Sequence, residues 1–323
     1  MSEQQNVIVT GASGQDGWYL CKQLLALGYA VTGTTHRPDA TWLDVAEHRV
    51  PLLPLDSRDT SALPALLREK RPAAVYNLAA RASSAQLFDD PLATAEANGL
   101  AVARWLEAIR RESPGTRFCQ ASSSEIFAGA TTSPQNEMTP RLPLSAYGAA
   151  KAYADHLVAA YRSAHGTFAC SAVLYSHESP RRPAHFLMRK VARAAASIAL
   201  GLETKVRLGD LDAARDWGYA PDYMDAMRRM LAADEPRDFV IASGESHTVR
   251  DVCEIAFGHV GLDWRRHVEV DEGLKRAPEA VLRVGDASRA RRDLGWAPSC
   301  AFAQLVTGLV DADRESLQRA PTF

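Results

Sequence analysis

Tyr147 and Lys151 are the residues best suited to proton transfer, and they stand four positions apart at the start of a segment, 146–165, that is predicted to be a helix. Side chains four apart lie on one face of a helix. A neighbouring ammonium favours the phenolate, so we expect Lys151 to lower the pKa of Tyr147 from about 10. Tyr147 is then suited to exchange a proton with a substrate hydroxyl while a hydride moves between that carbon and a nicotinamide. An ordinary pair on a helix surface is the alternative.

A hydroxyl and a carboxylate precede this helix in the chain. Ser123 and Glu125 follow the stretch 116–122, which is predicted to be a strand. Ligands of open α/β sheets bind outside the carboxyl ends of the strands. We therefore expect Ser123 and Glu125 to lie at the ligand-binding edge of a sheet.

Three glycines supply the turn that would hold a cofactor beside these groups. They directly follow a β-branched run at 7–10, and helical periodicity continues after them. This is the strand–turn–helix context of a dinucleotide-binding loop, in which the glycines allow a sharp turn, the approach of a pyrophosphate and close packing of the helix. The N–H groups of the helix N-terminus would face the phosphates. The cofactor-binding residues predicted here are Gly11, Ser13, Gly14, Gln15, Asp16 and Gly17.

Strand-like and helical segments alternate through the first half of the chain. The predicted strands are 29–35, 50–56, 74–80, 116–122 and 169–175, in addition to the first. A long helix is predicted from about 92 to 111, between the strands 74–80 and 116–122. The alternation predicts an α/β fold, a Rossmann-type doubly wound parallel sheet of about seven strands with right-handed crossovers. We expect residues 1–175 to form an NADP-binding Rossmann domain. Residues 176–323 are expected to form mainly a smaller C-terminal substrate-binding lobe, with some segments returning to the Rossmann domain.

The end of the predicted strand 29–35 selects between the two nicotinamide cofactors. NAD sites usually place a carboxylate there, and NADP sites place an arginine near the 2′-phosphate. The chain has Arg37 at this point and no carboxylate, which favours NADP; a solvated loop charge is the alternative. Asp56 follows the next strand, where an adenine would lie. Leu78 and Ala80 end the strand after that, where the cofactor would approach closely.

Composition argues against several other classes of protein. The formal net charge is −2, so no overall basic field favours a nucleic-acid polymer. The longest apolar helical segment, 191–202, contains Arg193 and is too short to span a bilayer, so we expect no membrane partner. Residues 1–5 leave no room for a signal peptide before the first strand, and the five cysteines lack metal-ligand spacing. These features predict a reduced, cytoplasmic protein without a metal.

Cations are concentrated after residue 176. Arginine suits phosphate groups, because its planar side chain donates two parallel hydrogen bonds. The group comprises Arg181, Arg182, Arg189, Lys190, Arg193 and Arg215. A solvated face, on which these cations pair with Asp210, Asp212 and Asp216, is the alternative.

Several segments together resemble one family, the GDP-mannose 4,6-dehydratases of the extended short-chain dehydrogenase superfamily. The similarity covers nearly the whole chain. Its His-Glu-Ser-Pro-Arg-Arg and Arg-Asp-Trp-Gly segments are far more specific than the serine, tyrosine and lysine of the superfamily. The matching positions are 10–17, 76–80, 120–125, 147 with 151, 177–182, 211–218, 244–250 and 294–296 with 298.

The resemblance implies a dehydration that uses NADP without consuming it. Tyr147 would deprotonate the sugar C4 hydroxyl as hydride leaves C4 for NADP⁺, and Glu125 would then remove the acidified C5 proton. Water would leave C6 and the hydride would return there, giving a 4-keto-6-deoxy sugar. Ser123 stands where the family usually has threonine and would orient the C4 oxygen. Simple hydride transfer needs no second base, so Glu125 distinguishes this reaction from that of a plain dehydrogenase.

The resemblance also implies binding roles and an assembly. His177 and Arg182 would contact the cofactor, whereas Lys190, Arg215 and Arg276 would face the diphosphate of a GDP-sugar. Ser176 replaces an amide that would face the substrate, and the segment 37–56 is shorter than the family's loop to a neighbouring subunit. The departures leave open the exact sugar and the choice between a homodimer and a homotetramer.

Three alternatives remain at this point. One is a nucleotide-sugar epimerase or 4-reductase on the same scaffold, since an epimerase also needs a C5 base. Another is a dehydratase acting on a GDP-linked heptose. The third is a cofactor-sensing or scaffold protein that kept the fold and lost turnover. The presence of Ser123, Glu125, Tyr147 and Lys151 together argues against the last of these.

Overall fold

A central sheet organises the structure, a computed structural model that describes residues 4–56, 58–59, 61–81, 90–274 and 281–319. In this part of the chain the sheet has eight strands in the order β11-β7-β6-β5-β1-β2-β4-β3. All neighbours pair in parallel except β3, which is antiparallel to β4. The strands are β1 (Asn6–Thr10), β2 (Ala30–Thr35), β3 (Trp42–Val45), β4 (His48–Pro54), β5 (Ala74–Asn77), β6 (Arg117–Ala121), β7 (Ala169–Leu174) and β11 (Phe239–Ile241).

Helices cover both faces of this sheet. Alternate residues of each strand point to opposite faces, so the apolar side chains of one strand enter two cores. Val7 and Val9 of β1 pack in one core with α1 (Gln15–Ala26) and α7 (Ala220–Ala232). Ile8 packs in the opposite core with α2 (Ala62–Lys70), α4 (Ala101–Glu112) and α5 (Ala146–His165). The predicted doubly wound α/β fold is therefore confirmed.

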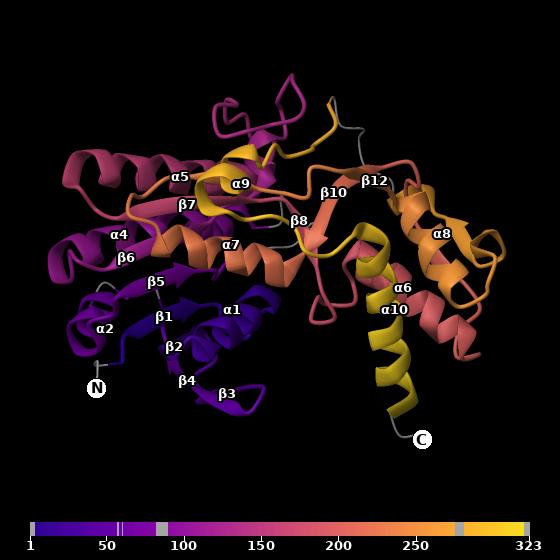
Figure 1. Cartoon of the computed structure of the whole chain (residues 1–323), viewed down its shortest axis with the longest axis horizontal. Coiled ribbons are helices and arrows are strands. Elements are labelled where there is room, and N and C mark those ends of the chain that lie inside the picture. Colours follow the sequence, from indigo (N-terminus) through magenta and orange to yellow (C-terminus); the bar gives the residue numbers. More distant parts are fainter. Residues whose placement is uncertain (1–3, 57, 60, 82–89, 275–280, 320–323) are drawn as a thin grey trace.

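A smaller lobe lies beside the sheet, at the right of Figure 1. Its core joins α6 (Leu187–Ala199), α8 (Val249–His259) and α10 (Phe302–Arg319). Two small sheets accompany them, β12-β10-β8 and β13-β9. Their strands are β8 (Ser176–Glu178), β9 (Val206–Leu208), β10 (Ala214–Tyr219), β12 (Ser246–Thr248) and β13 (Val268–Val270), and short 3-10 helices span Trp264–Arg266 and Glu272–Leu274.

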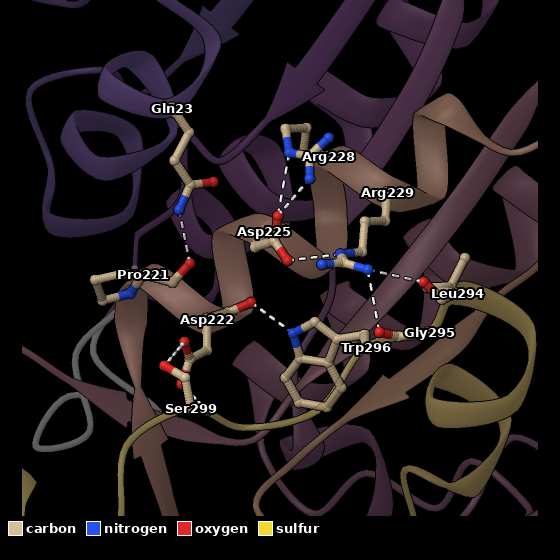
Figure 2. Close-up of polar contacts among 10 residues, drawn as sticks. All are labelled: Gln23, Pro221, Asp222, Asp225, Arg228, Arg229, Leu294, Gly295, Trp296 and Ser299. Carbon is tan, nitrogen blue, oxygen red and sulfur yellow. Dashed lines mark hydrogen bonds and ion pairs between the residues drawn. The ribbon is translucent and has the colours of Figure 1, made fainter. Parts of the chain in front are cut away.

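Parts of the second half of the chain belong with the large sheet. β11 pairs with β7 at the sheet edge, and α9 (Ser288–Leu294) packs against α7 and β11. Figure 2 shows the polar contacts that hold α7 in this position. Gln23 of α1 donates to Pro221 O at 2.8 Å, and Trp296 Nε1 donates to Asp222 O at 2.8 Å. Arg229 reaches the carbonyl oxygens that end α9.

Two local elements differ from the sequence prediction. The hairpin of β3 and β4 extends the sheet, although the periodicity of 42–45 is too short to predict it. The predicted helix 92–111 is divided into α3 (Pro91–Ala95), a π-helical turn (Glu96–Leu100) and α4. In the described part of the chain, no helix combines the length and apolar character needed to cross a membrane.

Candidate active site

The glycine loop joins β1 to α1 in a tight turn. Gly11 has φ +65°, in the left-handed region that glycine adopts without strain. A Cβ at Gly17 would lie 2.3 Å from the carbonyl oxygen of Gly11, so only glycine lets α1 pack this closely. Ser13 and Gly14 are exposed at the helix N-terminus. This cradle fits the pyrophosphate of a dinucleotide, because the N-terminus of a helix presents N–H groups and a positive dipole end to phosphates.

A buried polar network fixes the ends of three neighbouring strands. Thr10 Oγ1 donates to Asn77 Oδ1 at 2.7 Å, and Asn77 Nδ2 donates to Gln120 Oε1 at 2.7 Å. The same Thr10 oxygen accepts from the backbone N–H groups of Leu78 and Ala79 at 3.0 and 2.9 Å. The network holds the predicted cofactor contacts Leu78 and Ala80 beside the glycine loop. Sequence reasoning missed it because its members come from separate strands.

The first turns of α5 place Tyr147 and Lys151 at the end of β6. Ser145 caps the helix, accepting from the N–H of Gly148 at 3.0 Å. Lys151 Nζ donates to Ala121 O at 2.7 Å and lies 5.7 Å from the centre of the Tyr147 ring. The structure thus brings Tyr147 and Lys151 together as the sequence predicts.

Burial, not Lys151, dominates the acidity of Tyr147. Burial raises the pKa of Tyr147 to about 12, and a hydrogen bond with Ser123 only partly opposes it. Burial likewise lowers the pKa of Lys151 to about 8. The expectation that Lys151 lowers the pKa of Tyr147 is therefore wrong for the free protein. Lys151 is buried and Tyr147 is partly buried, and the ammonium hydrogen bonds to a backbone carbonyl.

Glu125 lies in the 3-10 helix Ser124–Phe127, which begins directly after Ser123. Its N–H donates to Ser123 Oγ at 3.3 Å. Its carbonyl packs against α5 so closely that a Cβ at Gly148 would lie 2.7 Å from that oxygen. On the carboxylate, Oε1 accepts from Arg283 Nη1 at 2.6 Å. No local signal in the sequence connects Arg283 with Glu125.

A second polar cluster joins the glycine loop to β8. His177 contacts Tyr175 O through Nδ1 at 2.7 Å and Asp16 Oδ2 through Nε2 at 3.0 Å. Both ring nitrogens therefore face acceptors, which favours the cationic ring. Gln15 donates to His177 O at 3.2 Å and accepts from Ser179 Oγ at 2.7 Å. These contacts tie three predicted cofactor residues, Gln15, Asp16 and His177, to one another.

A cavity of ≈ 520 Å³ lies between β8, α6 and β10, within the range of small-molecule sites. It gathers the predicted substrate residues Ser176, Lys190 and Arg215, and also Arg182, which was expected at the cofactor. Sequence reasoning missed its aromatic and acidic walls, formed by Phe186, Trp217, Asp210 and Asp212. The cavity thus combines cations for phosphates with planar apolar surface.

A smaller cavity of ≈ 90 Å³ extends the site toward Glu125. It shares Ser176 and Arg215 with the larger cavity. Its lining is polar or aromatic throughout: Ser124, Glu125, Tyr175, Ser176, Arg215, Asp216 and Arg283. The carboxylate of Glu125 therefore borders the inner end of the binding region.

Of the remaining predicted residues, two do not line these two cavities, and one lies outside the described residues. Arg37 is exposed just after β2, and its N–H donates to Thr35 Oγ1 at 3.1 Å. Asp56 forms an exposed ion pair with Arg58 at 2.7 Å, and hydrogen bonds from Arg58 lower the pKa of Asp56 to about 2. Arg276 lies outside the described residues. Among those described, no three histidine, cysteine or acidic side chains gather as metal ligands.

Comparison with known proteins agrees with this geometry. A family model described as GDP-mannose 4,6 dehydratase matches residues 8–309. GDP-mannose 4,6 dehydratase 1 of Arabidopsis thaliana is 42% identical, over 97% of this chain and 90% of the relative. GDP-mannose 4,6 dehydratase of Homo sapiens is 38% identical, over 99% of this chain and 95% of the relative.

Solved structures show the same fold at lower identity. UDP-glucose 4-epimerase from Thermotoga maritima superposes with a TM-score of 0.85 at 20% identity, covering 97% of this chain and 100% of the epimerase. RMD from Pseudomonas aeruginosa, complexed with NADPH, superposes with a TM-score of 0.80 at 23% identity, covering 97% and 98% of the two chains.

Proposed function

Because this chain belongs to the GDP-mannose 4,6-dehydratase family, we propose that it removes water from GDP-mannose to give the GDP-4-keto-6-deoxy sugar. The observation that carries the proposal is a pair of acid–base groups, Tyr147 and Glu125, held together by the close packing of α5 on Glu125. Oxidation at C4 needs one such group, and elimination across C5 and C6 needs another.

The roles of the side chains follow from this division. NADP held at the glycine loop would supply the oxidation at C4 and the matching reduction at C6, so no external oxidant or reductant would be consumed. Tyr147 takes the proton of the C4 hydroxyl, whose oxygen Ser123 orients, and Lys151 supports the phenol. Glu125 takes the C5 proton and gives a proton to the C6 hydroxyl, which leaves as water. One proton is delivered to C5 as the hydride returns to C6, and the proton that Tyr147 took from the C4 hydroxyl is given up in exchange, so the protons balance.

The larger cavity is the proposed site of the GDP moiety. Lys190, Arg215 and Arg182 line it and supply positive charge for a diphosphate. Phe186 and Trp217 offer planar surface to the base. We extend the proposal to Arg276, which the family resemblance assigns to the same diphosphate. Ser176 lies where the two cavities meet, at the proposed position of the sugar.

The cofactor belongs to the nicotinamide dinucleotides, and we propose that it is NADP. The support is the glycine cradle together with Arg37, which is exposed at the end of β2 where a 2′-phosphate would lie. Arg37→Asp should weaken NADP binding by about 1.5–3 kcal/mol, the usual contribution of a hydrogen bond to a charged group. Titration of both proteins with NAD and NADP tests this. Equal affinities of the wild type for the two cofactors would contradict the assignment.

We propose a homo-oligomer, a dimer or a tetramer, in the cytoplasm. Leu92, Leu100 and Tyr153 are exposed on α3, the adjoining π-helical turn and α5, which pack together. Large apolar side chains exposed on adjoining elements are typical of an interface. The five cysteines are free, as in a reducing compartment. Light scattering tests the assembly, and a monomeric wild type would contradict it.

The substrate proposal is tested by incubating the protein as purified with GDP-mannose, without added cofactor. Mass spectrometry should detect a product that has lost one water, because the cofactor is regenerated in each turnover. A product of unchanged mass would instead indicate an epimerase. A reaction that requires stoichiometric NADPH would indicate a reductase.

A further inference from the structure

Arg283 contacts the proposed C5 base directly. The side chain of Arg283 is 10% exposed and that of Glu125 is 23% exposed, so water competes weakly for the contact between them. The 2.6 Å hydrogen bond from Arg283 Nη1 is accepted by Oε1 of the Glu125 carboxylate. Around this pair lie Tyr147, whose pKa the charge of Glu125 raises, and Arg215, Asp216 and Tyr175 of the smaller cavity.

The backbone on both sides of Arg283 is tied to the rest of the site. Gln135 N donates to Val284 O, and Asp286 N donates to Gln135 O, both at 2.8 Å. Gln135 Nε2 donates to Leu282 O at 3.2 Å. These bonds form a short bridge of extended backbone between two distant segments of the chain.

Gly285 and Asp216 complete the restraint. A Cβ at Gly285 would lie 2.3 Å from Ala242 Cβ and 2.8 Å from the Tyr175 ring, so the backbone passes where only glycine fits. Gly285 N donates to the buried carboxylate of Asp216 at 3.1 Å. Asp216 also accepts from Ser243 and Gly244. The backbone from which the Arg283 side chain extends therefore has a fixed position before substrate binds.

We propose that Arg283 is a positioning residue for the dehydration step, holding Oε1 of Glu125 so that Oε2 is directed at the C5 proton of the sugar. The inference rests on the proposed function and concerns only the half-reaction at C5 and C6. Oxidation at C4 depends on Tyr147, Lys151 and Ser123, which Arg283 does not hold. A displacement of about 1 Å in a reacting group costs on the order of 100-fold in rate.

The test separates the two half-reactions in a single turnover. Wild type, Arg283→Gln and Arg283→Lys, each loaded with NADP⁺, are mixed with GDP-mannose in D₂O. Nicotinamide absorbance reports C4 oxidation, and mass spectrometry reports dehydration and deuterium at C5. In Arg283→Gln we expect C4 oxidation to persist while dehydration and C5 exchange fall about 10–100-fold. Arg283→Lys should recover part of that loss, because an ammonium can hold one oxygen but lacks the planar fork.

Arg292→Gln is the matched control, since Arg292 is also an ion-paired arginine of the C-terminal half, 68% exposed, with Asp293 as its partner. It should match the wild type in both half-reactions. Any one of three results would overturn this inference without affecting the proposed function. They are unimpaired dehydration in Arg283→Gln, equal loss of both half-reactions in that variant, and no recovery in Arg283→Lys. If the wild type itself does not dehydrate GDP-mannose, the proposed function fails, and the inference fails with it.

Discussion

Glu125 and Tyr147 divide the proton transfers between two carbons of the sugar, and their separate roles can be tested by substitution. Glu125→Gln keeps the size of the side chain but removes the base. Overall turnover should fall about 10²–10⁴-fold, the usual contribution of a positioned acid–base group. C4 oxidation should survive, so nicotinamide absorbance should rise on mixing with substrate without release of the keto-deoxy product.

Tyr147→Phe provides the contrast, because it should abolish both the absorbance change and the product. Wild-type turnover in Glu125→Gln would show that Glu125 is not the base. An epimerase or reductase would then become the better assignment.

The Asp16–His177 pair should make stability depend on pH. Burial acts to lower the pKa of His177, but the charge of Asp16 and the hydrogen bond to it raise that pKa above its ordinary 6.5, despite opposition from Arg182. Burial acts to raise the pKa of Asp16, but the charge of His177 and hydrogen bonds hold it below 3.8. The stabilisation by His177 is complete below its unfolded pKa and is lost as pH rises through the raised folded value.

We therefore expect Asp16→Asn to destabilise the protein by about 1.5–3 kcal/mol near pH 6, the usual contribution of a charged hydrogen bond, and by less at higher pH. Urea unfolding of both proteins at pH 6 and pH 9 measures the difference. Groups outside the pair titrate in both proteins and largely cancel. A difference that grows with pH would contradict the assigned charge of His177.

At the scale of elements, the approach of α1 to the glycine loop depends on the missing Cβ of Gly17. The added carbon of Gly17→Ala would lie 2.3 Å from Gly11 O and 2.5 Å from Ala12 Cα, both backbone atoms. The helix must shift, at a cost of about 1–3 kcal/mol in the free energy of unfolding, and cofactor affinity should fall with it. Thermal unfolding and cofactor titration measure the two effects.

Gly258→Ala in α8 is the control for this substitution. Nothing lies within 4 Å of its added Cβ, and the residue is exposed. Alanine should stabilise this helix by about 0.5–1 kcal/mol, because it loses less conformational entropy on folding than glycine. Equal effects of the two substitutions would contradict the close packing at Gly17.

At the scale of the whole molecule, the sheet depends on segments from the second half of the chain. β11 covers the edge of β7, and fully buried Tyr223 and Met227 of α7 complete one of its cores. A fragment of residues 1–175 should therefore lack cooperative unfolding and bind apolar dyes, as compact states without fixed packing do. Near-UV circular dichroism and urea titration test this. A fragment with a native-like spectrum and a sharp transition would contradict it.

The sequence alone determined the features that depend on neighbouring residues. The helix predicted over 146–165 has the bounds of α5, because helical periodicity is a local signal. The alternation of strands and helices likewise predicted the Rossmann-type sheet, and segments such as 177–182 and 215–218 indicated the family; both predictions are confirmed. Such patterns can be read from the sequence without knowing how distant parts of the chain pack.

The tertiary structure decided which distant residues meet and how strongly burial acts on them. Arg283 and Glu125 are 158 positions apart, and Asp16 and His177 are 161 apart, so no spacing in the sequence announces either pair. β11 joins the sheet because α7 returns the chain to its edge. The pKa of Tyr147 rises rather than falls because packing removes part of the water around the phenol, and that packing is a property of the assembled site.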